Sequence, residues 1–251
     1  MLDRRALRAL ELVALKAGRR GGRADVRDVC AAAVETLPVD GVGISAMYTP
    51  ALRHVLHTTD RISGELEELQ LTLGEGPCVD AIVSGSPVLS GDLSVGELHA
   101  RWPAFAPAAY AAGAHALFAL PLDAGGGIPG VLDMYASRTG TLEGEALAEA
   151  LAFADAATAL LLLATAGFRT VEGPGPGAME DVMGFDQYRA EIDQAVGMLT
   201  EQIGVGAEEA AVRLRAYAYA QSRKVGDIAV EVVARRLRFD PDGTTHVREE
   251  E

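Results

Sequence analysis

The chain has 251 residues, of which 49% are hydrophobic and 23% charged, and this composition excludes a globally disordered protein. It carries 22 Lys and Arg against 36 Asp and Glu, and the formal charge of −14 argues against unselective coating of nucleic acid. Its two cysteines, Cys30 and Cys78, are too few for a disulfide framework.

The N-terminal segment has the pattern of an amphipathic helix. Its apolar residues recur at helical spacing: Leu2, Ala6, Ala9, Leu10, Val13 and Ala17. Arg8 and Glu11 interrupt the apolar run that a signal peptide needs. We therefore expect a cytoplasmic protein whose first helix packs on its own domain or on a partner. A basic helix on a membrane surface is the alternative.

Helical and strand patterns alternate over the next hundred residues. Helices are predicted at 26–37, 65–73, 77–84 and 103–112, and strands at 42–48, 53–58, 114–122 and 128–135. The glycine-rich segment 125–130 lies between two predicted strands, which indicates a hairpin turn and not a phosphate-binding loop. Strands joined by hairpins and bracketed by helices predict an α+β fold, in which helices cover an antiparallel sheet.

A long apolar helix over 143–166 is expected to close a first domain that spans residues 1–167. One heptad seam consists of Leu147, Leu151, Ala154, Thr158, Leu161 and Thr165, and a second stripe of Ala150, Phe153, Ala157, Leu160 and Ala164. A helix that is apolar on two sides is buried on two sides. We expect it to pack on its own sheet and on a second copy of the chain, which predicts a homodimer. A transmembrane helix is the less favoured alternative because Asp155 lies inside the segment.

A linker is expected at residues 168–184, because the EGPGPG stretch at 172–177 cannot continue a helix. Three helical patterns follow, in which apolar residues recur from Ile192 to Ile203, from Ala207 to Ala218 and from Val225 to Leu237. They predict an all-α three-helix unit over 185–240, followed by an acidic tail over 241–251. A unit of this size is marginally stable alone, so we expect docking or dimerisation to support it.

Motifs for catalysis or metal binding are missing from the sequence. It contains neither a GxxxxGK[ST] phosphate loop nor a GxSxG nucleophile elbow, and His54 and His57 would face opposite sides of one strand. We therefore expect no enzyme, no cofactor and no metal site. Cys78 is a candidate redox residue, because the first turn of a helix lowers a thiol pKa. A small buried thiol is the favoured alternative for Cys78.

Two sets of motifs resemble known domain families. The first set resembles the GAF domains of actinobacterial regulators and comprises LGEGPCVDA at 73–81, PVL at 87–89, Asp92, RWPAF at 101–105 and FALPL at 118–122. The second set resembles the ANTAR domain and comprises IDQAVGML at 192–199, EEA at 208–210, RLR at 213–215 and DIA at 227–229. Together the two matches extend over about residues 25–238.

This resemblance implies a GAF–ANTAR transcription antitermination regulator. Its ANTAR unit would bind paired hairpins in nascent mRNA, under the control of a sensory GAF domain with an unidentified ligand. The alternative function is a small-molecule or redox sensor that acts through a protein partner without binding RNA. A DNA-binding helix-turn-helix is less favoured, because the second helix is long and the third exposes little that reads base edges.

Charge is distributed unevenly along the chain. Residues 185–239 contain eight basic and eight acidic residues, whereas residues 1–184 contain 13 basic and 23 acidic ones. Cations neutralise phosphates and aromatic rings stack on unpaired bases. The RNA-binding residues predicted from the resemblance and these charges are Gln194, Ala195, Gly197, Arg213, Arg215, Tyr219, Arg223, Lys224, Arg235 and Arg236. The alternative for Gly197 is close helix packing, and for Arg235 and Arg236 it is capping of the third helix.

Overall fold

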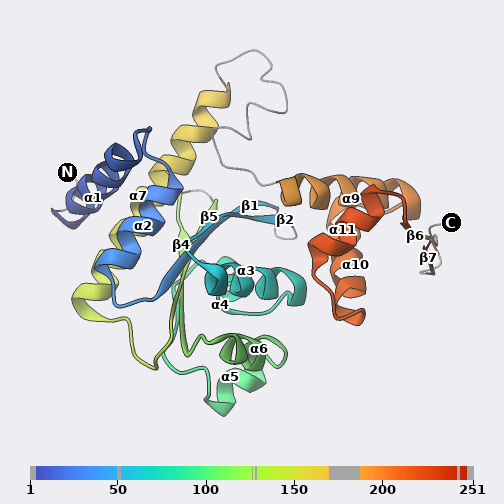
Figure 1. Cartoon of the computed structure of the whole chain (residues 1–251), viewed down its shortest axis with the longest axis horizontal. Coiled ribbons are helices and arrows are strands. Elements are labelled where there is room, and N and C mark those ends of the chain that lie inside the picture. Colours follow the sequence, from blue (N-terminus) through green and yellow to red (C-terminus); the bar gives the residue numbers. More distant parts are fainter. Residues whose placement is uncertain are drawn as a thin grey trace.

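The computed structural model describes residues 4–49, 52–125, 127, 129–169, 187–241 and 244–247. A five-stranded antiparallel sheet lies between two layers of helices, and a helical bundle lies beside one of these layers (Figure 1). The expected α+β fold class is confirmed: an antiparallel sheet covered by helices, followed by an all-α unit.

The sheet has the strand order β2-β1-β5-β4-β3. Its strands are β1 (Gly41–Thr49), β2 (Leu52–Thr58), β3 (Val88–Ser90), β4 (Ala116–Leu122) and β5 (Gly130–Ala136). Ile44 of β1 and Leu120 of β4 both pair with Leu132 of the central strand β5, and all three are fully buried. This row of cross-strand apolar pairs fixes the register of the sheet.

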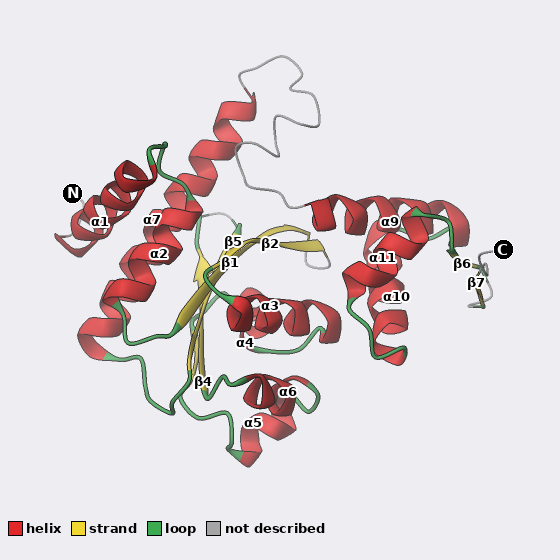
Figure 2. Cartoon of the chain, in the orientation of Figure 1, coloured by secondary structure: helices red, strands yellow, loops and turns green. Residues whose placement is uncertain are grey.

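Helices α2 (Val26–Thr36) and α7 (Gly144–Arg169) cover one face of the sheet, and α1 (Arg4–Arg20) packs on both of them (Figure 2). Helix α1 buries Ala9, Val13 and Ala17, and its Arg5 pairs with Glu145 of α7 at 2.7 Å. The N-terminal helix therefore packs on its own domain, which is one of the two arrangements expected from the sequence.

Helix α7 is partly buried in its own chain. Residues Gly144–Ala164 are long and apolar enough to cross a bilayer, but Phe153 and Ala157 are fully buried in the core of the sheet unit. Ala154, Thr158 and Leu161 of the predicted dimer seam are also buried within this chain. Leu151, another member of that seam, lies on the exposed side of α7 together with Asp155, Ala159 and Leu162. The homodimer through this helix stays a prediction.

Four helices cover the opposite face: α3 (Arg61–Leu73), α4 (Pro77–Ser84), α5 (Gly96–Arg101) and α6 (Phe105–Ala112). Trp102 and Phe105 pack edge to face there and are buried. Sequence analysis missed β3 and α5, because three- and six-residue elements are too short to show a periodic pattern.

The C-terminal bundle consists of α9 (Gln187–Ile203), α10 (Ala207–Ala220) and α11 (Val225–Val233). The third helix is shorter than predicted. Leu237 and Phe239 belong to strand β6 (Leu237–Phe239), which pairs with β7 (Thr245–Val247) inside the expected tail. Phe239 packs edge to face on Tyr217 at 5.2 Å and closes one end of the bundle. The expected linker at 168–184 lies largely outside the described residues, because α7 ends at Arg169 and the next described residue is Gln187.

Candidate functional site

The bundle contacts the sheet unit through helix α3 and strand β2. Leu71, near the end of α3, is buried in the same apolar cluster as Leu214 and Ile228 of the bundle. Near the start of α9, Oδ1 of Asp193 lies 3.3 Å from Nε2 of His54, which is buried on β2. Helix α3 therefore contributes to the cores of both units.

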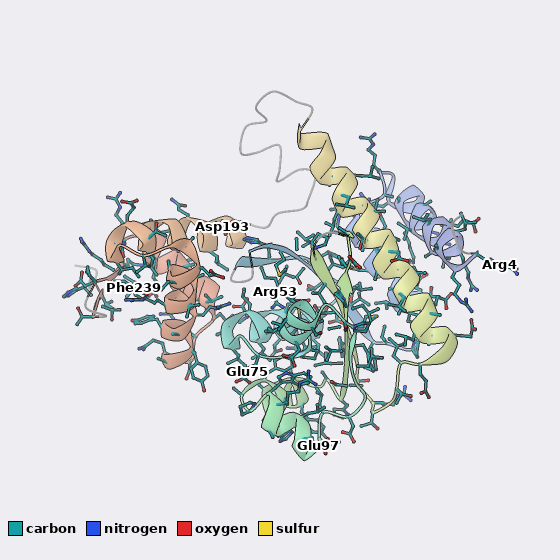
Figure 3. The ribbon with its side chains drawn as sticks, turned by 180° about the vertical axis from the view of Figure 1, so that it is seen from behind. Arg4, Arg53, Glu75, Glu97, Asp193 and Phe239 are labelled. Atoms are coloured by element: carbon teal, nitrogen blue, oxygen red, sulfur yellow. The ribbon has the colours of Figure 1, made fainter. Side chains whose placement is uncertain are left out.

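Arg215 of α10 is half-buried on the side of the bundle that faces the sheet unit. Burial lowers the pKa of its guanidinium, and the positive charge of Arg53 lowers it further. Figure 3 shows Arg53 on the flank of the sheet unit that faces the C-terminal helices. Among the predicted RNA-binding residues, Arg215 is thus only partly accessible while the bundle stays docked.

The structure distributes the remaining predicted RNA-binding residues unequally. Six of them are exposed: Gln194, Gly197, Tyr219, Arg223, Lys224 and Arg235. Arg213 and Arg236 are half-buried. Ala195 is fully buried in the bundle core, where its small side chain lets α9 pack against α11, so it does not face a ligand.

Gly197 lies on the open surface of α9. A Cβ atom built at Gly197 has nothing within 4 Å, so the described neighbours give no steric reason for glycine there. Glycine costs about 1 kcal/mol relative to alanine inside a helix. Close helix packing, the alternative interpretation of Gly197, therefore has no support among the described residues.

Two of the predicted arginines pair with carboxylates on the bundle surface. Nη2 of Arg213 lies 2.6 Å from Oε1 of Glu209, and Nη2 of Arg223 lies 2.8 Å from Oε1 of Glu231. The bond to Glu231 raises the pKa of Arg223. Exposed ion pairs of this kind contribute about 0–1 kcal/mol, so a phosphate can replace the carboxylate at little cost.

Arg235 and Arg236 lie in the turn after α11 and not in its last helical turn, which corrects the expectation that they end the third helix. The backbone of Arg235 has φ +58°, a left-handed conformation that favours glycine. Its amide donates to the carbonyl of Val232 at 2.9 Å. The capping interpretation therefore applies to the backbone of Arg235, while its side chain is exposed.

The GEGPC motif between α3 and α4 has a structural role. Gly74 ends α3 with φ +67°, and Gly76 has φ +122°, where a Cβ would lie 2.7 Å from Oε1 of Gln70. That Gln70 oxygen accepts the backbone N–H of Cys78 at 2.8 Å. Oε2 of Glu75 accepts the backbone N–H of Phe105 at 3.1 Å, at the start of α6. The motif therefore fixes how three helices meet over the sheet.

Cys78 is fully buried, and the expectation of a lowered thiol pKa is wrong. Burial raises the pKa of Cys78 well above its usual range, outweighing the lowering effect of Arg53, whose Nη1 donates to Sγ. The low-dielectric surroundings disfavour the thiolate more than the helix start favours it. The interpretation of Cys78 as a buried structural thiol has the stronger support.

Sequence analysis missed a buried charged cluster around Cys78. Its members are Arg53 of β2, Glu67 and Gln70 of α3, and Asp133 of β5, all buried. Nη2 of Arg53 lies 3.9 Å from Oε2 of Glu67 and donates to the Glu67 backbone carbonyl at 3.3 Å. In the sequence, these residues are single charged or polar side chains within largely apolar strands and helices. That pattern does not distinguish a buried charged residue from one on a solvent-exposed face.

A cavity of about 10 Å³ adjoins this cluster, and it is large enough for about one water molecule. Glu67 and Gln70 line it from α3, Asp133 and Tyr135 from β5, and Gly43 from β1. Burial raises the pKa of Asp133, although Arg53 and hydrogen bonds from Cys78, Glu67 and Gln70 act in the opposite direction. The cavity therefore has an acidic wall inside the sheet unit.

Comparison with known proteins identifies the C-terminal unit. Residues 187–233, which span α9, α10 and α11, match the ANTAR domain. The chain therefore contains an ANTAR domain after a GAF-like sheet unit, in the expected order. No curated protein matches this chain.

The sheet unit is similar to several solved structures. The GAF domain of a phosphoenolpyruvate-protein phosphotransferase from Coxiella burnetii has 18% identity and a TM-score of 0.49, covering 65% of this chain and 98% of that one. The corresponding GAF domain from Acinetobacter has 11% identity and a TM-score of 0.48, covering 67% and 99%. The free methionine-R-sulfoxide reductase from Neisseria meningitidis, solved with its substrate, has 18% identity and a TM-score of 0.41, covering 65% and 96%.

Proposed function

We propose that this chain is a cytoplasmic, RNA-binding transcription antitermination regulator that recognises paired hairpins in nascent mRNA. The observation that carries the proposal is the ANTAR match at 187–233, on whose surface Gly197, Tyr219, Arg223 and Lys224 are exposed together with Arg235 just beyond it. Arginine and lysine supply phosphate contacts, and an exposed tyrosine supplies a stacking surface for an unpaired base.

The sheet unit controls the ANTAR domain through α3. Glu67 and Gln70 line the cavity between α3 and the sheet, while Leu71 of the same helix is buried in the apolar cluster of the bundle. A shift of α3 on ligand binding therefore moves a side chain of the bundle core. The docked form is the restrained form, because Arg215 is half-buried against the sheet unit and gains full access to RNA only on release.

A homodimer places two RNA-binding units on one assembly and raises the effective concentration of the second for a two-hairpin RNA. Because Ala154, Thr158 and Leu161 of the expected seam are buried within the chain, we assign the dimer contact to the exposed side of α7, where Leu151 of that seam and Leu162 are 40% and 45% exposed. Asp155 lies between them, and burial raises its pKa. Light scattering after size exclusion, on wild type and Leu151→Glu, tests this contact.

Binding to a tandem-hairpin leader RNA from the same genome tests the proposed function. We expect Arg223→Ala to weaken binding and to lower the slope of affinity against salt by about one unit, as loss of one phosphate contact requires. Arg138→Ala is the matched control, because Arg138 is exposed on the sheet unit. Failure of the wild-type protein to bind any such RNA at moderate salt would refute the proposal.

An exposed apolar stripe on α10 favours a second candidate function, a sensor that acts through a protein partner. Val212, Ala216 and Tyr219 lie along one side of the helix, and Val212 and Tyr219 are 48% and 58% exposed. Such a stripe fits the apolar face of a partner helix as well as a base. Tyr219→Ala separates the two functions. If the chain is an RNA-binding regulator, the substitution weakens RNA binding. If the chain is a sensor that acts through a protein partner, neither the wild type nor the variant binds RNA.

A further inference from the structure

The cavity beside α3 has carboxylates on two opposing walls. Glu67 comes from the helix above the sheet, and Asp133 comes from the central strand β5 below it. Both side chains are more than nine-tenths buried. Carboxylates in such surroundings require hydrogen-bond donors or a positive charge, since an uncompensated buried charge is costly.

Donors on the described residues around the cavity are largely committed elsewhere. Arg53 donates to Sγ of Cys78 and to the Glu67 backbone carbonyl, and its Nη2 lies 3.9 Å from Oε2 of Glu67. The hydroxyl of Tyr135 donates to Asp60 at 2.9 Å. Oδ2 of Asp133 is buried and has no hydrogen-bond partner among the described residues. Cys78, Glu67 and Gln70 form hydrogen bonds with the Asp133 carboxyl group, but its buried Oδ2 still lacks a donor in the described part of the chain.

We propose that this cavity is the sensory site of the sheet unit and that it binds a small ligand through a protonated amine held by Asp133 and Glu67. The proposal deepens the proposed function, since it names the ligand class to which that regulator responds. An ammonium group supplies three donors and one positive charge. It thereby matches two carboxylates that share a single guanidinium.

The size of the cavity determines which part of the ligand enters. About 10 Å³ accommodates a group the size of water or ammonium. Glycine at position 43 keeps this space open, because the Cβ of any other residue there would lie 2.6 Å from Oε1 of Glu67. A ligand larger than ammonium must displace α3, and Leu71 on that helix transmits the movement to the bundle.

Binding of an amine also changes the protonation of the site. The groups that face Asp133 are Arg53 from β2, Glu67 from α3 and Cys78 from α4, and burial raises the pKa of Asp133 in their presence. Because the pKa of Asp133 is raised, an ammonium that binds there displaces the proton wherever the carboxyl group still holds it. Binding is expected to release about one proton and to tighten as pH rises through the range in which Asp133 ionises.

Calorimetry on the full-length protein tests the proposal, with methylammonium, ethylammonium and 1,4-diaminobutane as probes and methanol and ethanol as neutral counterparts. We expect the amines and not the alcohols to bind and to raise Tm. The binding enthalpy should depend on the ionisation enthalpy of the buffer, which reports the released proton. Amines that bind no better than alcohols overturn the proposal.

Matched variants locate the site. Asp133→Asn keeps the side-chain shape and removes the charge, so we expect about ten- to hundredfold weaker amine binding in a folded protein. Gly43→Ala fills the cavity without changing charge and should also abolish binding. Glu97→Gln, on the exposed surface of α5 (Figure 3), should bind like wild type. Unchanged affinity in folded Asp133→Asn assigns the amine to another site and overturns the proposal.

RNA affinity measured without amine keeps this test separate from that of the proposed function. RNA binding by a protein that ignores amines leaves the antitermination proposal standing and removes the ligand assignment. Amine binding by a protein without RNA affinity supports the ligand assignment and refutes the antitermination proposal.

Discussion

Arg215 of the ANTAR domain and Arg53 of strand β2 bring two like charges together across the contact between the two units. Burial lowers the pKa of Arg215, and the charge of Arg53 adds to that effect. The contact thus combines apolar burial of Leu71 with electrostatic repulsion. Such a balance suits a docked state that a signal must be able to open, because population shifts need the two states to be close in free energy.

Replacing Arg215 by Gln removes the repulsion and the cost of burying a charge. We expect the free energy of unfolding to rise by up to about 1 kcal/mol and RNA affinity to fall. Chemical denaturation and RNA titration measure the two effects. Arg213→Gln, on the same helix but paired with Glu209 at the surface, should change stability by less than about 0.5 kcal/mol. Equal stability effects in the two variants would contradict a specific role for Arg215 in docking.

Leu71→Ala should release the bundle from α3. Truncation of a buried leucine costs about 2–5 kcal/mol, and here part of that loss falls on the contact between units. Hydrogen exchange is expected to accelerate in α10, and RNA affinity is expected to increase because Arg215 becomes accessible. Leu69→Ala is the control, since Leu69 packs on the core of the sheet unit. If Leu71→Ala weakens RNA binding, the docked form is the active one.

Two substitutions at Gly197 test helix stability and the proposed RNA recognition separately. Gly197→Ala should stabilise the protein by about 0.5–1 kcal/mol, because a Cβ meets open space in the interior of a helix. Gly197→Leu should also fold but should block close approach of RNA to α9. Melting curves and RNA titrations on both variants measure these effects, and unimpaired RNA binding by Gly197→Leu would place the interface elsewhere.

Arg235 has a left-handed backbone that favours glycine. Arg235→Gly should therefore raise the free energy of unfolding by about 1 kcal/mol, while it removes a charge from the proposed RNA-binding surface. A gain in stability with a loss of affinity indicates that arginine is retained for its side chain. Arg235→Lys serves as the control, since it keeps the charge and the backbone cost and should bind RNA nearly as wild type does.

Asp133 should make stability depend on pH in the direction opposite to that of a surface carboxylate. Its folded-state pKa is raised above the unfolded value of about 3.9, so the folded state holds the proton to higher pH. Its contribution to stability is therefore full at low pH and declines as pH rises from about 4 through the folded-state pKa. Asp133→Asn should remove this decline, and denaturation of both proteins across that range measures the difference. Parallel curves would show that Asp133 does not titrate in this way.

Much of the fold was predictable because local signals agree with the tertiary structure. The Gly76-Pro77 pair predicts the start of α4, whose observed bounds Pro77–Ser84 equal the predicted ones. The apolar period from Ile192 to Ile203 likewise predicts α9, whose buried residues follow it. These elements were found because capping, turn chemistry and periodicity all depend on neighbouring residues.

The candidate sites were harder to predict because they depend on contacts between distant segments. Arg215 reads as a surface cation on α10, and only the docking of Leu71 reveals that it is half-buried. Arg53 and Asp133 lie on different strands, and nothing local indicates that both meet Glu67 inside the core. At Cys78 the helix start was visible in the sequence, but the burial that outweighs it was not.

The layer that contains α7 lies on the opposite side of the sheet from the ANTAR domain (Figure 1). Two copies that met through the exposed side of α7 would therefore hold their RNA-binding units at the two outer ends, with both sheet units between them. Such an assembly would fix the distance between its two RNA-binding units. One RNA molecule could then occupy both units only if the separation of its two hairpins matched that distance. The length of RNA between the hairpins thus becomes a physical determinant of which leaders are selected.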